Sequence, residues 1–416
     1  MKKTIEEINR KIAQKTAVVC TAAELKQRIA RGETITAADV DVVTTGTFGV
    51  MSGTLAVLHI PVAPPGTFRK AEKVWLNGVP AIPGPCPNEG LGSVDVIVYG
   101  TAHASPTYGG GHLFRDLVEG NAVQVEVESD GKRFCHSVTL AEIPHARIIT
   151  TRSAFKNYLA VVNTGSDPVK TIFAAEDLSG PYTGATVSGC GDINPVQNDP
   201  DLNVIGVGTR VLLNGGTGYI TGTGTRATKE KPNIAAVADM KRMVPAMMGG
   251  FVTSAGPECT TSVAIPIPVL DDAILRNLRV TNNQIPLPVA DVRDRVPFAS
   301  ATYADVWDGT DPVISFSRES CLQCDPCAAQ AACPAGAIEP VQGINPARCV
   351  NCGTCVQTCA GNACTGTTGA LMFDGRRVPI ILRQSDRARA LQLCEDLKNQ
   401  ILDGRFVLIE KTEDLL

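Results

Sequence analysis

Residues 321–359 read CLQCDPCAAQAACPAGAIEPVQGINPARCVNCGTCVQTC and contain eight cysteines in two C-x-x-C-x-x-C runs, each followed by a fourth cysteine. Two residues between cysteines let one tight loop aim three thiolates at three irons of a [4Fe–4S] cube. In two-cluster ferredoxins, the fourth ligand of each cube comes from the other run. We therefore predict two [4Fe–4S] clusters with crossed ligand sets. The first set is Cys321, Cys324, Cys327 and Cys359, and the second is Cys349, Cys352, Cys355 and Cys333.

The spacing leaves two alternatives open. Five residues precede Cys333, where the plain ferredoxin pattern has three, and Cys364 competes with Cys359 for the last ligand position. We assign Cys359 because its spacing is the standard one. The alternative metal is structural zinc, whose sites usually use two separated C-x-x-C pairs.

The composition describes a globular chain with room for two or three domains. It has 416 residues, 44% apolar residues and a formal net charge of −4, without a Lys/Arg cluster that would indicate nucleic-acid binding. No apolar run reaches membrane-spanning length, and the start of the chain lacks a signal-peptide core. Fifteen cysteines with cluster spacing indicate a reducing interior. We expect a cytoplasmic protein that binds neither nucleic acid nor membrane.

The alternation of short strands and helices predicts a mixed, β-rich α+β fold. Capping boxes at Thr4/Glu7 and Thr21/Glu24 predict two N-terminal helices. We expect a catalytic domain over residues 1–311, which ends in an irregular, proline-rich boundary at 281–311. A ferredoxin-like 2[4Fe–4S] domain follows over 312–376, and a strand–helix–strand tail over 377–416 packs on the main body. In the tail we expect a helix capped by Ser385 and a strand at Phe406–Ile409.

Residues 123–140 predict a β-hairpin, because apolar and polar residues alternate on both sides of Asp130-Gly131. A two-residue turn places Cys135 opposite Glu126. His136 shares a face with apolar neighbours and is expected in the core. The carboxylate opposes formation of a Cys135 thiolate, whereas the adjacent basic residues favour it.

Two glycine-rich stretches predict an anion site. Gly46–Gly53 follows a predicted strand and Gly109–Gly111 precedes a predicted helix, so both are expected to offer backbone N–H groups. The alternatives are a plain tight turn for the first stretch, a helix-start residue for His112 and a paired structural ion for Arg210. Cys190, in a flexible Ser-Gly-Cys-Gly loop, is a candidate exposed thiol. The candidate substrate-binding residues are Gly46, Thr47, Gly49, Gly110, Gly111, His112 and Arg210.

Six stretches taken together resemble one family over roughly residues 1–280. They are Val43-Thr-Thr-Gly-Thr-Phe-Gly49, Leu76-Asn-Gly-Val-Pro80, Tyr108-Gly-Gly-Gly-His112, Asn198-Asp-Pro200, Ile205-Gly-Val-Gly-Thr-Arg210 and Ile265-Pro-Ile-Pro-Val-Leu270. The chain resembles the archaeal and bacterial homocysteine-biosynthesis proteins, the L-aspartate-semialdehyde sulfurtransferases. That resemblance implies an enzyme that exchanges an aldehyde oxygen for a thiol, with sulfur carried on cysteine and electrons from a ferredoxin-type partner. The fused cluster module resembles the methanogenesis-marker metalloprotein branch, thought to serve coenzyme M synthesis.

The resemblance also implies roles for single residues. Cys135 matches the position of the sulfur-carrying cysteine, which would hold a persulfide. The family's other cysteine falls where this chain reads Met51-Ser52-Gly53, and Cys86 or Cys190 are the candidates to replace it.

The expected reaction is reductive sulfur insertion into an aldehyde, with sulfoacetaldehyde converted to coenzyme M as the first choice. The alternative is L-aspartate semialdehyde converted to homocysteine. A rival of another class is an electron-transfer module fused to a non-catalytic binding domain. The expected partners are a small aldehyde, a sulfide or persulfide donor, an external low-potential electron donor and further copies of the chain in a homo-oligomer.

Overall fold

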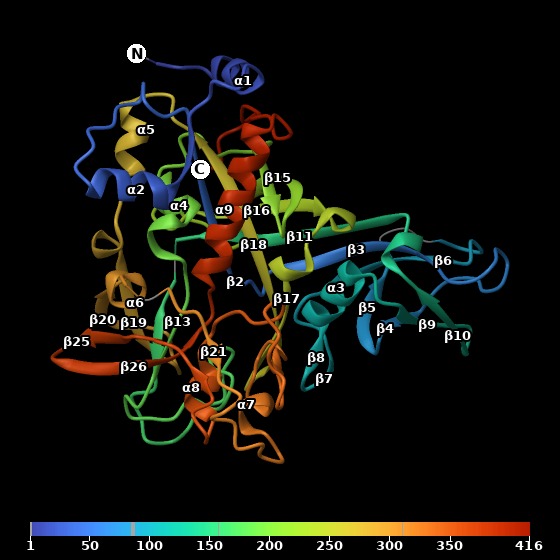
Figure 1. The fold of residues 1–416 in the computed structure, drawn as a ribbon. Helices are drawn as coiled ribbons and strands as arrows, with labels where there is room; N and C mark the ends of the chain where they lie inside the picture. The colour runs from blue at the N-terminus through green and yellow to red at the C-terminus, as the bar shows by residue number, and fades with distance from the viewer. Residues whose placement is uncertain (1, 85–87, 157, 310) are drawn as a thin grey trace.

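Two β-sheets form the frame of the molecule (Figure 1). The computed structural model describes residues 2–84, 88–156, 158–309 and 311–416, so Cys86 lies outside the described residues. The mixed, β-rich α+β class predicted from the sequence is confirmed by the succession of short strands and helices.

The larger sheet has 14 strands. They are β1 (Val19–Thr21), β2 (Val42–Val50), β3 (Thr54–Pro61), β4 (Lys73–Leu76), β5 (Val79–Pro83), β6 (Ser93–Tyr99), β9 (Val123–Ser129), β10 (Lys132–Val138), β11 (His145–Phe155), β14 (Arg210–Leu213), β15 (Gly216–Thr223), β16 (Asn233–Asp239), β17 (Gly249–Thr253) and β18 (Gly256–Pro268). Their order is β1-β2-β18-β14-β15-β16-β11-β3-β6-β5-β4-β9-β10, and β17 pairs with β18. The strands from β3 to β10 extend from the body as an arm, on the right of Figure 1.

The smaller sheet has six strands, in the order β20-β19-β12-β13-β26-β25. They are β12 (Ala160–Val162), β13 (Ala185–Val187), β19 (Pro286–Asp291), β20 (Pro297–Thr302), β25 (Ala370–Phe373) and β26 (Arg376–Arg383). The expectation of an irregular boundary at 281–311 is wrong, because β19 and β20 pair there as two strands of this sheet. Strand β26 pairs in parallel with β13, which docks the start of the tail on the main body.

The described residues contain nine α-helices. They are α1 (Ile5–Ala13), α2 (Ala22–Ala30), α3 (Gly110–Glu119), α4 (Pro195–Asn198), α5 (Asp272–Asn277), α6 (Ala304–Trp307), α7 (Ala328–Ala331), α8 (Thr354–Thr358) and α9 (Arg387–Leu402). Short 3₁₀ turns occupy Leu140–Glu142, Gly191–Ile193, Met240–Arg242, Pro245–Met247 and Asn282–Gln284. Both predicted N-terminal capping boxes are confirmed. None of these helices is long and apolar enough to cross a membrane.

Helix α9 packs closely against β2, where Gly46 leaves room for the helix (Figure 1). A Cβ atom at Gly46 would lie 2.7 Å from the Cys394 Sγ and 3.1 Å from the Ala390 carbonyl oxygen. The predicted cap Ser385 is wrong by one residue, since the Asp386 carboxylate accepts the N–H of Arg389 and caps the helix. The helix thus starts directly beside the strand that carries the TGTFG stretch.

The chain end differs from the predicted strand at Phe406–Ile409. These residues adopt no regular secondary structure. Phe406 is fully buried, and the Leu408 backbone exchanges hydrogen bonds with the Asn9 side chain at 2.9 and 3.0 Å. Hydrogen bonds from the Asn9 side chain of α1 therefore hold this segment in place of the predicted strand pairing.

The segment with the eight cysteines repeats a strand–helix–strand unit. Its strands are β21 (Ser315–Phe316), β22 (Ile338–Glu339), β23 (Gly343–Ile344) and β24 (Cys364–Thr365). A separate two-stranded pair, β7 (His103–Ser105) and β8 (Tyr108–Gly109), precedes α3 and is not part of this segment. The outer strands β21 and β24 pair with each other, as do the inner strands β22 and β23. Helices α7 and α8 pack together between them.

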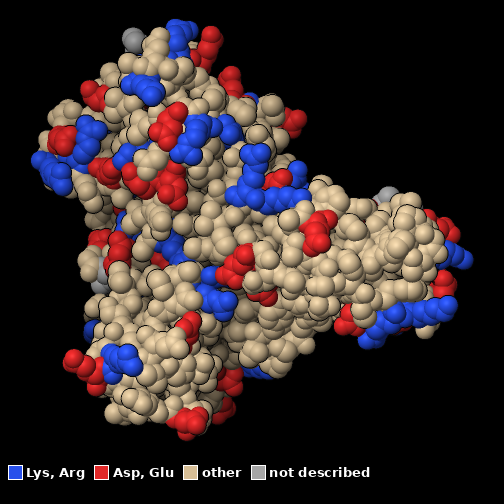
Figure 2. All heavy atoms as spheres, turned by 45° about the vertical axis from the view of Figure 1, so that its right-hand side comes forward, with Lys and Arg blue, Asp and Glu red and all other residues tan. Residues whose placement is uncertain are grey.

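The predicted hairpin forms the tip of the arm, with Cys135 opposite Glu126 as expected. The expectation that His136 lies in the core is wrong, because its side chain is exposed. Strand β10 is the last strand of the sheet and pairs with β9. On the face shown in Figure 2, basic and acidic side chains are interspersed.

Candidate functional site

A pocket of about 270 Å³ opens where β2 ends and the chain turns towards β3. Val50, Met51 and Ser52 line it at that turn. The remaining lining residues come from distant parts of the chain and are Arg152, Phe155, Leu159, Ile172, Phe173, Ser188, Arg226, Arg295 and Gln384. We call this set the arginine pocket. The turn at Met51-Ser52-Gly53, where the family resemblance expects a cysteine, is therefore part of a pocket.

Three guanidinium groups give the arginine pocket its charge. Burial lowers the pKa of Arg152, and the positive charges of Arg226 and Arg295 lower that pKa further, so both groups lie close enough to Arg152 to repel it. The Arg152 guanidinium lies 4.4 Å from the Phe155 ring centroid, and that of Arg295 lies 5.6 Å from the Phe173 ring centroid. In the described part of the chain, no carboxylate forms an ion pair with Arg226 or Arg295. An anionic ligand would relieve this repulsion.

The glycines of the TGTFG stretch serve packing and do not form the predicted anion cradle. Gly46 and Gly49 are not among the residues with positive φ. A Cβ atom at Gly49 would lie 2.7 Å from the Ser385 Oγ. The Thr47 hydroxyl is buried and lies 3.1 Å from the Tyr158 hydroxyl. These residues hold α9 and the segment before it against β2, just below the arginine pocket.

The second predicted glycine cradle is wrong for a similar reason. The Gly110 N–H donates to the Ala102 carbonyl at 2.8 Å and the Gly111 N–H to the Gly100 carbonyl at 3.0 Å. His112 Nδ1 accepts the N–H of Gly109 at 3.3 Å, and burial lowers the pKa of His112 to about 4. The two glycine donors are used inside the fold, and His112 is a neutral helix-start residue.

Arg210 also lies outside the arginine pocket. Its guanidinium lies 4.4 Å from the Phe406 ring centroid, and its Nη1 donates to the Val407 carbonyl at 3.5 Å. This arginine contacts the C-terminal segment from β14, away from the arginine pocket, and its role in substrate binding stays a prediction.

Cys190 is fully buried, so the expected exposed thiol is wrong. Its Sγ lies 3.5 Å from both the N and the O of Phe48, within the TGTFG stretch. Burial raises the pKa of Cys190 to about 11. The Cys190 thiol is close to β2, the strand that ends at the arginine pocket, but it does not line this pocket.

The four cysteines assigned to the second cluster line one small pocket. Cys333, Cys349, Cys352 and Cys355 surround it together with apolar side chains. Backbone N–H groups point at two of the sulfurs, from Ala337 to the Cys333 Sγ at 3.2 Å and from Asn351 to the Cys349 Sγ at 3.4 Å. Over the residues that the structure describes, no group of three or more Cys, His, Asp or Glu side chains is arranged to hold a metal ion. Four cysteine thiols are the kind of donor that a [4Fe–4S] cluster takes, and the cluster at this pocket stays a prediction.

The first cysteine run lies nearer the surface. Cys324 is exposed, whereas Cys321 and Cys327 are half-buried. The loop approaches the chain beyond Cys359, because a Cβ atom at Gly361 would lie 2.6 Å from the Ser320 carbonyl oxygen. This approach agrees with a ligand set that crosses between the two runs.

The fourth position of the first set has two candidates side by side. Burial alone raises the pKa of the Cys359 thiol, but N–H groups of Cys364, Ala363 and Gly361 outweigh burial and hold that pKa below its ordinary value. Cys364 is buried next to Cys359 and Cys355. Cys359 thus has the N–H donors that stabilise a thiolate, and Cys364 stays the alternative.

Residues 383–385 join the cysteine segment to the arginine pocket. The Arg383 N–H donates to the Cys352 carbonyl at 2.9 Å. The next residue, Gln384, lines the arginine pocket, accepts the Val50 N–H at 3.0 Å and donates from its side chain to the Ile172 carbonyl at 2.8 Å. One hydrogen bond and one peptide unit therefore separate a predicted cluster ligand from the pocket wall.

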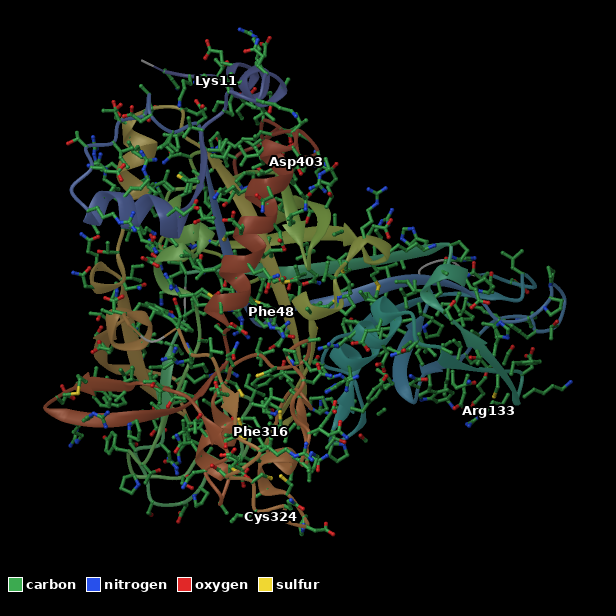
Figure 3. The ribbon with its side chains drawn as sticks, in the orientation of Figure 1. Lys11, Phe48, Arg133, Phe316, Cys324 and Asp403 are labelled. Carbon is green, nitrogen blue, oxygen red and sulfur yellow. The ribbon has the colours of Figure 1, made fainter. Side chains whose placement is uncertain are left out.

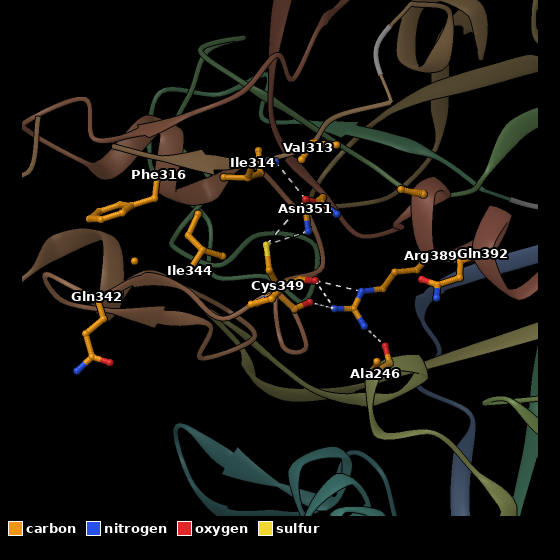
Figure 4. Close-up of a pocket in the computed structure, with 13 residues that line it drawn as sticks. Ala246, Val313, Ile314, Phe316, Gln342, Ile344, Cys349, Asn351, Arg389 and Gln392 are labelled. Atoms are coloured by element: carbon orange, nitrogen blue, oxygen red, sulfur yellow. Dashed lines mark hydrogen bonds between the residues drawn. The ribbon is translucent and has the colours of Figure 1, made fainter. Parts of the chain in front are cut away.

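Arg389 fastens the second cysteine loop to α9 (Figure 4). Its Nε donates to the Cys349 carbonyl at 3.0 Å, and its Nη2 donates to the Pro346 carbonyl at 2.8 Å. The Asp386 carboxylate lies 3.4 Å from Arg389 and accepts a hydrogen bond from the Asn351 amide at 3.0 Å. Arg389, Pro346 and Asn351 border a groove of about 560 Å³ beside Cys349.

Cys135 lies far from both pockets. It is exposed on β10, where Arg133 pairs with Glu126 at 3.0 Å. Figure 3 shows Arg133 at the tip of the arm and Cys324 at the foot of the body. The sheet order places five strand spacings between β3, next to Ser52, and β10, which is roughly 24 Å. The structure does not bring Cys135 to the arginine pocket of its own chain.

The pattern that defines the homocysteine biosynthesis enzymes, described as sulfur-incorporation, matches residues 17–408. The chain is 47% identical to an uncharacterised protein of Methanothermobacter thermautotrophicus over 97% of this chain and 94% of the relative. It is 38% identical to an uncharacterised protein of Methanocaldococcus jannaschii over 94% of this chain and 99% of the relative. It is 32% identical to the L-aspartate semialdehyde sulfurtransferase of M. jannaschii over 72% of this chain and 62% of the relative. No solved structure matches.

These similarities define a sulfur-incorporating enzyme. The chain belongs to the homocysteine biosynthesis family, as the TGTFG and related stretches predicted.

The sequence did not identify the three arginines. Arg152 lies within a strand, Arg226 in a Gly/Thr-rich loop and Arg295 beside other charged residues, with no shared motif. The fold alone brings them together, and a sequence pattern carries no signal for that arrangement.

Proposed function

We propose that this protein converts a small anionic aldehyde to a thiol and that the arginine pocket binds the aldehyde. The observation that carries this proposal is the set of three guanidiniums around the turn where the TGTFG strand ends. Arg152, Arg226 and Arg295 would bind the acidic group of the substrate and orient its aldehyde towards Ser52. Apolar walls from Phe155 and Phe173 would limit access of water.

L-aspartate semialdehyde is the first candidate substrate, because two relatives that are 32% and 30% identical are named for this aldehyde. Sulfoacetaldehyde is the second candidate. One observation favours it, which is that the described lining of the arginine pocket contains three arginines and no carboxylate to receive an ammonium group.

The reaction consumes electrons. With a persulfide as the sulfur source, one aldehyde, four electrons and four protons give one thiol, one water and the carrier thiol. With sulfide as the source, two electrons suffice. The predicted clusters, held by Cys321, Cys324, Cys327, Cys359, Cys349, Cys352, Cys355 and Cys333, would supply electrons singly, and their N–H···S bonds are of the kind that tunes cluster potentials.

Cys135 is the proposed sulfur carrier. Because it lies roughly 24 Å from the arginine pocket along the sheet, we propose that it serves the pocket of another copy of the chain. The exposed position on an edge strand gives a partner access to the thiol.

The test offers both aldehydes to anaerobically reduced protein with sulfide or a persulfide donor, and measures homocysteine and 2-mercaptoethanesulfonate by mass spectrometry. Preferential formation of one thiol identifies the substrate. Iron and acid-labile sulfide analysis of the same preparation should give about eight irons per chain. Electron uptake without either thiol would contradict the enzymatic proposal and support an electron-transfer module instead.

A further inference from the structure

One face of the larger sheet is covered by helix α9 at one end and open over the rest. Gly46, Ala264, Leu212 and Thr217 pair in turn across β2, β18, β14 and β15, so all four point to this face. Helix α9 packs on it beside Gly46. From β15 to β10 the outward side chains on this face are half-buried or exposed. We call the part that these nine strands form, from β15 through β16, β11, β3, β6, β5, β4 and β9 to β10, the open face.

A row of apolar side chains crosses the open face. Five neighbouring strands contribute one residue each, and the directly paired residues are Tyr219, Val237, Ile149, Leu55 and Tyr99. Tyr219 and Tyr99 are 43% and 47% exposed, and the other three are half-buried. A contiguous apolar surface of this kind marks an interaction site.

The same row leads to Cys135. Strand β5 pairs with β6 in the register that puts Pro80 level with Tyr99. Pro80 pairs with Trp75 of β4, Trp75 with Glu126 of β9, and Glu126 with Cys135 of β10. Cys135 therefore lies at one end of the row and points to the open face.

The arginine pocket borders the other half of the row. Thr151 follows Ile149 by two residues on β11, and its hydroxyl donates to the Gly53 carbonyl at 3.2 Å. Arg152, the next residue, lines the arginine pocket. The proposed sulfur carrier and the proposed substrate pocket are thus joined by one continuous surface.

The charges on the open face are paired across neighbouring strands. The pairs are Arg147–Asp239 at 2.5 Å, Arg133–Glu126 at 3.0 Å, Lys73–Glu128 at 2.8 Å and His59–Asp95 at 2.6 Å. Each pair joins a basic side chain to a carboxylate, so these residues form neither a basic stripe for a nucleic acid nor an acidic patch for a basic partner. An identical face can meet this one without strong like-charge repulsion. The charge balance therefore favours a second copy of the chain as the partner.

The size of the open face also suits a stable dimer. Eight strand spacings of about 4.8 Å separate β15 from β10, which is roughly 38 Å. Three outward positions along a strand cover about 20 Å. The product is roughly 800 Å², about the area that each partner buries in a specific protein–protein interface.

We propose that two copies of the chain pack through their open faces. This inference rests on the proposed function and deepens it, because it names the surface by which Cys135 reaches the pocket of another copy. Strand β5 lies three strands from β10 and three strands from β11. A two-fold axis along β5 therefore places β10 of each copy over β11 of the other, across the roughly 10 Å that separates packed sheets. Since Cys135 and Ile149 lie in one row, each thiol then faces the strand that carries the partner's Arg152.

The first test measures the oligomeric state of the full chain by sedimentation velocity. Wild type should form a dimer. Ile82→Lys/Tyr99→Lys places like charges at two side chains that are 48% and 47% exposed on the open face, and it should raise the dimer Kd by about 100-fold or more. Met372→Lys, at a side chain 52% exposed on β25 of the smaller sheet, is the matched control and should leave the Kd unchanged.

The second test needs no substitution and decides if the double variant does not fold. Hydroxyl-radical footprinting compares wild type above and below its dimer Kd. Trp75, Tyr99 and Tyr219 should be oxidised more slowly in the dimer. Phe298, 44% exposed on β20 of the smaller sheet, should react equally in both states.

The outcomes separate this inference from the proposed function, because neither measurement uses substrate. A wild type that stays monomeric at about 100 µM overturns the inference, since two faces of this size should associate more tightly. A dimer whose Kd is unchanged in the folded double variant, or whose three aromatic side chains stay unprotected, also overturns it. A dimer that behaves as expected but forms neither thiol supports the interface and refutes the proposed function alone.

Discussion

The Arg389 Nε donates a hydrogen bond to the Cys349 carbonyl at 3.0 Å, from helix α9 to the loop that carries the second cysteine run. The same guanidinium lies 5.7 Å from the ring centroid of Phe48, in the TGTFG stretch. One buried side chain thus links the cysteine loop to the strand that ends at the arginine pocket.

Arg389→Gln should loosen this loop, because glutamine cannot reach all the carbonyl groups that Arg389 holds. We expect iron loss to a chelator to become about 10- to 100-fold faster for one of the two proposed clusters. Absorbance decay under anaerobic conditions measures the rate. Arg405→Gln, at an exposed ion pair with Asp403, is the matched control. Equal rates in both variants would contradict the fastening role.

Arg226→Gln and Arg295→Gln should each raise KM for the aldehyde by about 10- to 100-fold, the loss expected for one hydrogen bond to a charged group. kcat should change less, because the acidic group of the substrate is bound in both the ground and the transition state. Steady-state thiol formation gives both constants. Arg31→Gln, on the surface after α2, should leave them unchanged. Wild-type KM in both pocket variants would place the substrate elsewhere.

Gly46→Ala should destabilise the protein by about 1–3 kcal/mol, because the added methyl group would lie 2.7 Å from the Cys394 Sγ in a closely packed interface. Denaturant unfolding measures the loss. Gly222→Ala, where nothing lies within 4 Å of the added atom, is the control. Adding Cys394→Ala to Gly46→Ala should recover part of the loss if the sulfur contact is the cause.

Iodoacetamide at pH 8 should modify Cys135 and spare Cys190. Cys135 is exposed, whereas Cys190 is fully buried and burial raises its pKa to about 11. The thiolate reacts, so Cys190 should become reactive only as the pH approaches that value or the protein unfolds. Peptide mass spectrometry of the native protein reports both sites. Modification of Cys190 at pH 8 would contradict the buried position.

Cys135→Ser and the Arg226→Glu/Arg295→Glu double variant, each expected to be inactive alone, should regain activity when mixed. Each hybrid pair would contain one intact sulfur carrier and one intact pocket on different copies. Random exchange between two-copy assemblies should restore roughly a quarter of wild-type activity. Thiol formation after mixing and equilibration measures the gain. A mixture as inactive as its components would show that sulfur does not pass between copies.

The sequence correctly predicted those structural features that depend on interactions between neighbouring residues. The Thr4/Glu7 and Thr21/Glu24 capping boxes and the register of the hairpin around Asp130-Gly131 each depend on a few neighbouring residues, and all are confirmed. The cysteine spacing likewise grouped Cys333 with Cys349, Cys352 and Cys355, which line one pocket.

The errors arose where distant elements decide the outcome. The alternation in β10 predicted a buried His136, but a face is buried only where another element covers it. The glycines at 46 and 49 signalled close approach correctly, yet the approaching groups are α9 and Ser385 and not a ligand. The arginine pocket draws its side chains from β11, the turn after β2, several separate loops and residue 384, so no window of the sequence contains it.

Strand β26 lies between β13 and β25, and Gln384 follows it directly in the wall of the arginine pocket. A chain made from its N-terminus exposes both cysteine runs to the cell before this strand leaves the ribosome. The cysteine loops are therefore available to the proposed clusters before the chain that completes the arginine pocket has been made. A nascent chain that stalls before residue 383 would hold every proposed cluster ligand and still lack a finished substrate pocket.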